Sequence, residues 1–294
     1  MNPAEADTAR DGAMSSDVLR TGPGRIARQL ISSQVALSHA FDGLLPRSFC
    51  VDGSKDFKQR IVPGYLRPGL VVYDIGGGAR PCVDLETKRR LGLTVRGIDI
   101  DEGQFAKAPR GLYDRAIVAD ITTYQEQNAA DLVVCKSTLE HVRNTEAALA
   151  AMARLLNPGG TLLVFVPSRN ALYARLNLLL PQRVKLRLLS TFMSKQADHL
   201  GFPAFYDHCT PHHFRRFATG CGLQIKELKP YYISSYFSVV FPVYVLWRVW
   251  ILAYWAMARE HAAESFALIA RKPERPHARR GDESGGVNQL EIEK

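Results

Sequence analysis

LVVYDIGGGAR, residues 70–80, is a short apolar run that leads directly into three consecutive glycines. The apolar run predicts a buried strand. Gly76, Gly77 and Gly78 predict a tight turn whose backbone can approach a ligand closely, because glycine lacks a Cβ. Ligands of an open parallel sheet bind beyond the carboxyl ends of its strands, which is where this turn is expected. The alternative is a turn that does no more than connect a strand to a helix.

Four further apolar runs alternate with stretches of helical pattern along the chain. They are TVRGIDI (94–100), RAIVADI (115–121), ADLVVCKS (130–137) and TLLVFVP (161–167). Strands that alternate with helices predict a parallel sheet, and their continuous apolar character predicts that both faces are covered. The sequence therefore predicts a doubly wound α/β domain over residues 66–271.

The regions outside this domain differ from it in composition. Residues 1–25 and 272–294 are polar and contain helix breakers or mixed charges, which predicts disorder. Residues 26–65 begin with apolar side chains at helical spacing and form a predicted helical lead-in. The amino-terminal residues include acidic side chains and no apolar stretch of a signal peptide, and the five cysteines are widely separated. We therefore expect a cytoplasmic protein without a disulfide framework.

The second strand ends in Asp99, which is a candidate for binding the hydroxyls of a ribose. Both nicotinamide and adenosyl cofactors carry a ribose, and a solvated carboxylate that binds nothing is the third possibility. The glycine pattern is D-x-G-x-G rather than G-x-G-x-x-G, and no tyrosine of the chain has a lysine four positions later. A nicotinamide-dependent oxidoreductase is therefore disfavoured, although it stays an alternative.

The segment ADLVVCKSTLEHVRNTEAALAAMARLLNPGGTLLVFVP (130–167) resembles the region of class I S-adenosylmethionine-dependent methyltransferases that spans their fourth and fifth strands. The resemblance is to type 11-like members and covers about residues 70–229. It implies a Rossmann-like, mostly parallel sheet of seven strands and the cofactor S-adenosyl-L-methionine. It also implies a cofactor-binding residue for each part of that molecule: Asp74, Gly76, Gly77 and Gly78 for the methionine portion, Asp99 and Ile100 for the ribose, Asp120 and Ile121 for the adenine, and Lys136 and Ser137 at the end of the fourth strand.

Arg80 departs from the family pattern, which usually has a third glycine at this position. We expect its guanidinium to pair with the methionine carboxylate or with an anionic substrate. The departure also leaves open a catalytically weak module that binds the cofactor without turnover.

Methyl transfer to a hydroxyl requires a base, and two histidines are candidates. His141 lies in the Leu-Glu-His-Val turn after the fourth strand, where it alternatively bonds to its own turn. His208 belongs to YDHCTPHHF (206–214), in which Thr210 and Pro211 predict a helix start. His212 and His213 are adjacent and point to different sides of that helix, so we expect no metal site.

Residues 230–247 and 249–258 carry no charged side chain, and Arg248 separates them. Arg248 inside a bilayer would cost about 2.5–3.5 kcal/mol, which favours peripheral over spanning attachment. On one helix, Ser234, Ser238, Arg248 and Arg259 would form a narrow polar stripe on an otherwise apolar surface. We therefore expect an apolar helical insertion (230–260) before the last strand, whose residues 231–258 contact the headgroup region of the inner membrane face. A lid or a dimer interface is the alternative, and the oligomeric state stays open.

The predicted function is S-adenosylmethionine-dependent O-methylation of a lipid-linked, saccharide or other small acceptor near a membrane. The net charge of +9 raises the question of nucleic acid. The basic residues are dispersed, however, and the aromatic residues lie in an apolar block rather than between lysines and arginines. Nucleic acid is therefore disfavoured.

Overall fold

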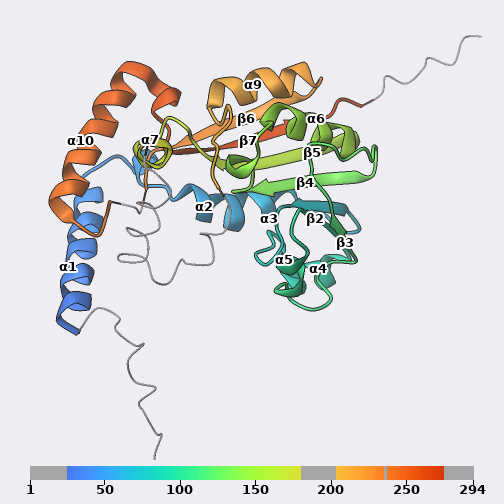
Figure 1. Ribbon diagram of the computed structural model, residues 1–294, viewed down its shortest axis with the longest axis horizontal. Helices are drawn as coiled ribbons and strands as arrows, with labels where there is room; N and C mark the ends of the chain where they lie inside the picture. The colour runs from blue at the N-terminus through green and yellow to red at the C-terminus, as the bar shows by residue number, and fades with distance from the viewer. Residues whose placement is uncertain (1–24, 180–202, 235–236, 275–294) are drawn as a thin grey trace, which may run out of the picture.

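The computed structural model describes residues 25–179, 203–234 and 237–274, and a seven-stranded sheet forms its centre (Figure 1). The strand order is β3-β2-β1-β4-β5-β7-β6, with β1 to β5 parallel and β7 antiparallel to both of its neighbours. The strands are β1 (Val71–Ile75), β2 (Thr94–Asp99), β3 (Arg115–Val118), β4 (Ala130–Lys136), β5 (Leu156–Pro167), β6 (Gln224–Tyr231) and β7 (Ser265–Arg271). The predicted doubly wound, mostly parallel sheet is confirmed.

β5 begins earlier than the predicted start at Thr161. Leu156 pairs with Ala130, and the register then shifts before Thr161 pairs with Leu132. The Asn-Pro-Gly-Gly sequence therefore forms a bulge within the strand rather than a turn that precedes it.

Helices and turns cover both faces of the sheet, as apolar strands require. On one face, Leu149, Met152 and Phe214 pack over Tyr73 and Val164. The helices of the domain are α4 (Leu85–Leu91), α5 (Glu102–Ala106), α6 (Thr145–Leu155), α7 (Leu172–Leu179) and α9 (Pro211–Gly220).

The lead-in consists of α1 (Arg25–Asp42), η1 (Arg47–Phe49), α2 (Gly53–Asp56), the π-helical η2 (Phe57–Ile61) and α3 (Val62–Tyr65). Its later part, η2 and α3, covers the opposite face of the sheet. Phe57 and Val62 pack there against the cluster that contains Val134 and Leu163. Asp56 fixes the lead-in to β6 because Lys229 Nζ (2.9 Å) and the Tyr231 hydroxyl (2.6 Å) both donate to its carboxylate. The hydrogen bond from Arg60 is the main cause that holds the pKa of Asp56 far below its usual range.

The apolar insertion lies between β6 and β7 as predicted, but it is not one helix with a polar stripe. α10 (Phe241–Ala258) begins ten residues after β6 ends and is followed by η5 (Arg259–Ala262). Ser234 and Ser238 precede the helix, so the predicted line from these serines to Arg248 is wrong. Pro242 occupies the first turn, where its missing N–H costs nothing, and the Gln34 side chain of α1 accepts a hydrogen bond from Phe241 N (2.9 Å).

Arg248 faces the protein interior and is fully buried. Its Nε lies 2.9 Å from Asp42 Oδ1, and its other nitrogens donate to the carbonyls of Tyr232 (2.8 Å) and Phe49 (3.1 Å). The Tyr244 hydroxyl donates to the second carboxylate oxygen of Asp42. The buried ion pair therefore joins α1, η1 and α10 into one appendage, visible as two adjacent helices at the left of Figure 1.

Replacing Asp42→Ala should destabilise the protein by about 3–5 kcal/mol, because it leaves the Arg248 guanidinium buried without its anion. Urea unfolding measures this loss. Glu274→Ala is the control: it breaks the exposed pair with Arg271 and should cost about 0–1 kcal/mol. Equal costs for the two variants would contradict the structural role of the buried pair.

Candidate functional site

The glycine turn is pressed between the ends of β2 and β4. Gly76 has φ +67°, and a Cβ at this position would lie 2.3 Å from Thr138 Oγ1. Gly76 N also donates to the Ile98 carbonyl at 2.7 Å. Gly78 has φ +33°, and a Cβ there would lie 2.6 Å from Gln104 Cβ. Larger residues are thus excluded by both backbone conformation and space.

Asp74 holds this turn in place from behind. Its carboxylate is buried and accepts hydrogen bonds from Cys82 N (3.0 Å) and the Tyr113 hydroxyl (3.3 Å). A Cβ on Gly77 would lie 2.3 Å from the same carboxylate. Burial raises the pKa of Asp74 to about 6. Asp74 therefore ties the turn to the residue Cys82 that follows it and to Tyr113 before β3, and so fixes the shape of the turn.

Asp99 lies directly beside the turn, as its place at the end of β2 predicts. A Cβ on Gly78 would be 2.7 Å from Asp99 Oδ2, while Oδ1 accepts from Asp101 N at 3.0 Å. Partial burial raises the pKa of Asp99 above its usual value. Ile100 follows with 64% of its surface exposed, which provides an apolar surface next to the carboxylate.

Asp120 and Ile121 lie on the same edge of the sheet, after β3. The Ala119 N–H donates to the Asp99 carbonyl (3.0 Å) and so connects the two segments. Ile121 is buried, whereas Asp120 is exposed and its Oδ1 accepts from both the backbone and the hydroxyl of Thr122, each at 2.8 Å. The structure thus brings Asp120 to this edge, although its own turn already binds one carboxylate oxygen.

The end of β4 completes the site. Ser137 has φ 54°, and its N–H donates to the Phe165 carbonyl at 2.9 Å. Lys136 Nζ lies 5.8 Å from the centre of the Phe165 ring. Thr138, which the sequence analysis did not single out, contacts Gly76 and donates its hydroxyl hydrogen to the Ile75 carbonyl at 3.2 Å. The sequence could have indicated Thr138 as a site residue, because it directly follows Lys136 and Ser137.

His141 and Glu140 lie in η3 (Leu139–His141), the turn that follows β4. Burial lowers the pKa of His141, so its imidazole is neutral at neutral pH, and its Nδ1 is 3.1 Å from the Pro203 carbonyl. Glu140 is buried, and this burial raises its pKa to about 8. The Glu140 carbonyl accepts from Phe205 N (2.8 Å) and Tyr206 N (3.0 Å). The segment that begins at residue 203 is therefore docked on this turn.

His208 belongs to that docked segment rather than to the turn of His141. Its Nδ1 is 2.8 Å from Asp207 Oδ1, and Asp207 Oδ2 accepts from Thr145 N (3.0 Å). Thr210 caps α9 as predicted, with its side chain accepting from His213 N. Within the described ranges, no three His, Cys, Asp or Glu side chains are placed to hold a metal ion.

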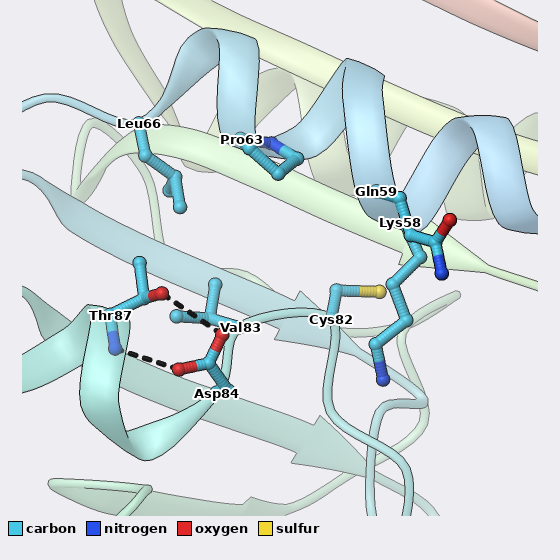
Figure 2. Close-up of a pocket in the computed structure, with 8 residues that line it drawn as sticks. All are labelled: Lys58, Gln59, Pro63, Leu66, Cys82, Val83, Asp84 and Thr87. Carbon is cyan, nitrogen blue, oxygen red and sulfur yellow. Dashed lines mark hydrogen bonds between the residues drawn. The ribbon is translucent and has the colours of Figure 1, made fainter.

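Arg80 is exposed at the end of the glycine turn, where its N–H donates to the Gly77 carbonyl (2.6 Å). A cleft of about 310 Å³ lies nearby between the lead-in and the residues after the turn, and Figure 2 shows Lys58 extending past Cys82 into it. Cys82 is the residue whose N–H holds Asp74. The lead-in therefore borders the loop that shapes the cofactor site. The cleft is lined by Lys58, Gln59, Pro63, Leu66, Cys82, Val83, Asp84 and Thr87.

These features fit an adenosyl cofactor. The glycines leave no room for a Cβ, Asp99 presents a carboxylate oxygen at the turn, and Asp74 keeps the turn closed. The individual residue roles stay predictions.

Comparison with known proteins finds similarity to methyltransferases. The methyltransferase domain family matches residues 73–164. A ubiquinone biosynthesis O-methyltransferase of Cupriavidus pinatubonensis is 30% identical over 168 residues, which cover 55% of this chain and 63% of that protein. Phosphoethanolamine N-methyltransferase 2 of Caenorhabditis elegans is 28% identical over 138 residues, which cover 42% of this chain and 30% of that protein. The chain thus spans less than two thirds of either relative.

Among solved structures, phosphoethanolamine N-methyltransferase 2 of Haemonchus contortus in complex with S-adenosyl-L-methionine has a TM-score of 0.47 at 17% identity, covering 82% of this chain and 57% of that one. The matched domain and the seven-stranded Rossmann-like sheet define the class: S-adenosylmethionine-dependent methyltransferases. Residues 73–164 of this chain match the methyltransferase domain family. The predicted family, fold and cofactor are confirmed.

Gly76→Ala should abolish binding of S-adenosylmethionine, because the new Cβ meets Thr138 and pushes the turn open. Gly92→Ala is a matched control, since Gly92 also has a positive φ (+60°) but nothing within 4 Å of its Cβ position. Both changes carry the left-handed strain of about 1–2 kcal/mol, and only the first displaces the glycine turn. Isothermal calorimetry distinguishes them, and retained binding by Gly76→Ala would show that the turn does not hold the cofactor.

Proposed function

We propose that this protein transfers a methyl group from S-adenosylmethionine to a hydroxyl of a lipid-linked, saccharide or other small acceptor at a membrane surface. The observation that carries the methyl-transfer part is the glycine turn packed against Thr138 and flanked by Asp99. The oxygen acceptor is supported by the relative named as an O-methyltransferase. A nitrogen acceptor is the second candidate, because another relative is named as an N-methyltransferase.

Each residue of the site has a distinct task in this proposal. Asp74 and Thr138 hold the turn, and Asp99 accepts hydrogen bonds from the cofactor ribose. The cofactor, when bound, supplies an electrophilic methyl group on a sulfonium. The neutral imidazole of His141 takes the proton of the acceptor hydroxyl, which requires positioning within hydrogen-bond reach.

His141→Gln should lower kcat by about 10²–10⁴-fold, because the side chain that accepts the proton is lost. A base must be unprotonated, and burial sets the pKa of His141 below 6.5. Activity of the unaltered protein should therefore rise with pH up to that pKa and stay level above it, and the variant should lack this limb. Formation of S-adenosylhomocysteine with a total lipid extract measures both.

His39→Gln, at an exposed residue of α1, is the control and should retain the full pH dependence of activity. An unchanged rate in His141→Gln would remove His141 from the mechanism.

Calorimetric titration separates the alternative functions. Cofactor binding without turnover would indicate the catalytically weak module, and binding of NAD in place of S-adenosylmethionine would indicate the oxidoreductase.

The membrane part of the proposal is supported by where exposed apolar side chains gather. Of the fifteen exposed large apolar side chains within the described residues, thirteen lie on or beside α1, α7 and α10. Scattered apolar residues are normal at a protein surface, but a concentration of this kind marks a contact site. The thirteen are Leu30, Ile31, Leu37, Leu44, Leu176, Leu178, Leu179, Val239, Val240, Val243, Leu246, Val249 and Met257.

The orientation of α10 favours peripheral contact. Among the described helices, one segment, Phe241–Ala262, is long and apolar enough by length and composition to cross a membrane. Arg248 is turned inward to Asp42, so the outward faces carry Val243, Leu246 and Val249. The strands β4 and β5 point their carboxyl ends toward this appendage (Figure 1). An apolar acceptor could therefore reach the site from the lipid surface.

Liposome flotation with anionic vesicles tests this attachment. The intact protein should float, and salt should release it only partly, because each large apolar side chain that enters the interface contributes about 1.5–3 kcal/mol. Leu246→Glu should weaken flotation strongly. Val118→Glu is the matched control, because it introduces the same charge at an exposed apolar residue of β3, outside this surface. An intact protein that stays soluble at low salt and forms a defined dimer would identify this surface as a protein interface.

A further inference from the structure

Basic side chains gather around the amino-terminal end of α9. The rings of His208 and His213 are 4.7 Å apart, and those of His212 and His213 are 5.7 Å apart. Arg216 follows His213 by three positions on α9 and so lies on the same face of the helix, and Arg169 is held beside the start of α9 because its N–H donates to the Cys209 carbonyl (2.7 Å). Both arginines are exposed. This cluster of three histidines and two arginines is not used by the methyl-transfer site described above.

The positively charged side chains of the cluster repel one another. Burial is the main cause that lowers the pKa of His213, and His208, His212, Arg216 and Arg169 lower it further by repulsion. Two acidic residues and one further histidine lie beside the cluster, and the ring of that histidine, His261 of η5, is 6.4 Å from the ring of His212. Asp207 pairs with His208 (2.8 Å), and Glu260 of η5 pairs with Arg215 (3.2 Å), which is outside the cluster. His213 lies at the centre of the cluster, and its Nδ1 is 2.7 Å from Thr210 Oγ1.

The cluster lies at the carboxyl edge of the sheet. Arg169 follows the end of β5 at Pro167, and its N–H donates to the Cys209 carbonyl at 2.7 Å. The docked segment carries two residues with positive φ, Tyr206 (50°) and His208 (49°). Non-glycine residues rarely adopt this conformation, and it concentrates at functional sites. The same segment contacts the turn that carries His141.

We propose that Arg169, His213 and Arg216, with His208 and His212, bind a phosphate-class dianion carried by the methyl acceptor. This inference rests on the proposed function and narrows its acceptor to molecules with a phosphate group. Guanidinium groups bind two oxygens of such an anion at once, and protonated imidazoles add N–H donors. His208 is then an anion-binding residue, and His141 stays the base.

Titration with inorganic sulfate tests the site, because sulfate keeps its charge between pH 5 and 8. Binding, followed by side-chain NMR of the histidines, should be at least tenfold tighter at pH 5.5 than at pH 8, since the imidazoles bind the anion when protonated. Sulfate should also raise the pKa of His213. Arg169→Gln and Arg216→Gln should each weaken binding at least tenfold.

Arg215→Gln is the matched control on the same helix: it removes the same charge but leaves the cluster intact. Equal sulfate affinity in Arg169→Gln, Arg216→Gln and Arg215→Gln, or affinity independent of pH, would overturn the proposal. Circular dichroism verifies that the variants fold, which is expected because both arginines are exposed.

Two competition experiments identify the molecule that carries the anion. Competition by glycerol 3-phosphate would indicate a soluble phosphate ester, whereas competition by phosphatidic acid vesicles and not by phosphatidylcholine vesicles would indicate a lipid headgroup. Calorimetry with S-adenosylmethionine on the same samples separates the two proposals. Sulfate binding without cofactor binding would contradict the proposed function alone, and cofactor binding without sulfate binding would contradict this inference alone.

Discussion

The close approach of the glycine turn to the ends of β2 and β4 is the constraint on which the site depends. Thr138 occupies the space that a Cβ on Gly76 would need, and Asp99 occupies that of Gly78. Asp74 can hold the turn only because Gly77 also lacks a side chain. Asp74 of β1, Asp99 of β2 and Thr138 after β4 are thereby fixed relative to one another by contacts within the protein, which is the condition for a preorganised binding site.

Burial of charge plays a different role in the appendage formed by α1, η1 and α10. The Arg248 side chain is excluded from water, and its partner Asp42 comes from the far end of the chain. A pair of this kind contributes little net stability, but it fixes which face of a helix points inward. Here it directs the polar side of α10 to the protein and leaves the apolar sides outside, which is the reverse of an ordinary surface helix.

The sequence predicts the strands, Asp99 beside the turn and Thr210 as a helix cap, because each depends on local patterns of apolar runs and capping residues. The direction in which Arg248 points was not predictable, since it depends on Asp42, which only the tertiary fold brings near. Helical periodicity likewise placed Ser234 and Ser238 on α10, whereas Pro242 and the Gln34 side chain set its start at Phe241. Thr138 was missed because its importance arises from its contact with Gly76, which lies far from it in the sequence, in the turn after β1.

The contact between α1 and α10 has a consequence for synthesis of the chain on the ribosome. Tyr244 and Asp42, which share a hydrogen bond, are separated by 202 positions in the chain. Ribosomes add about 5–20 residues per second, so α1 emerges roughly 10–40 s before its partner helix. During that interval Asp42 lacks its cation and the apolar side chains of α1 lack their neighbour. The nascent chain therefore exposes the apolar side chains of α1 until α10 has been synthesised.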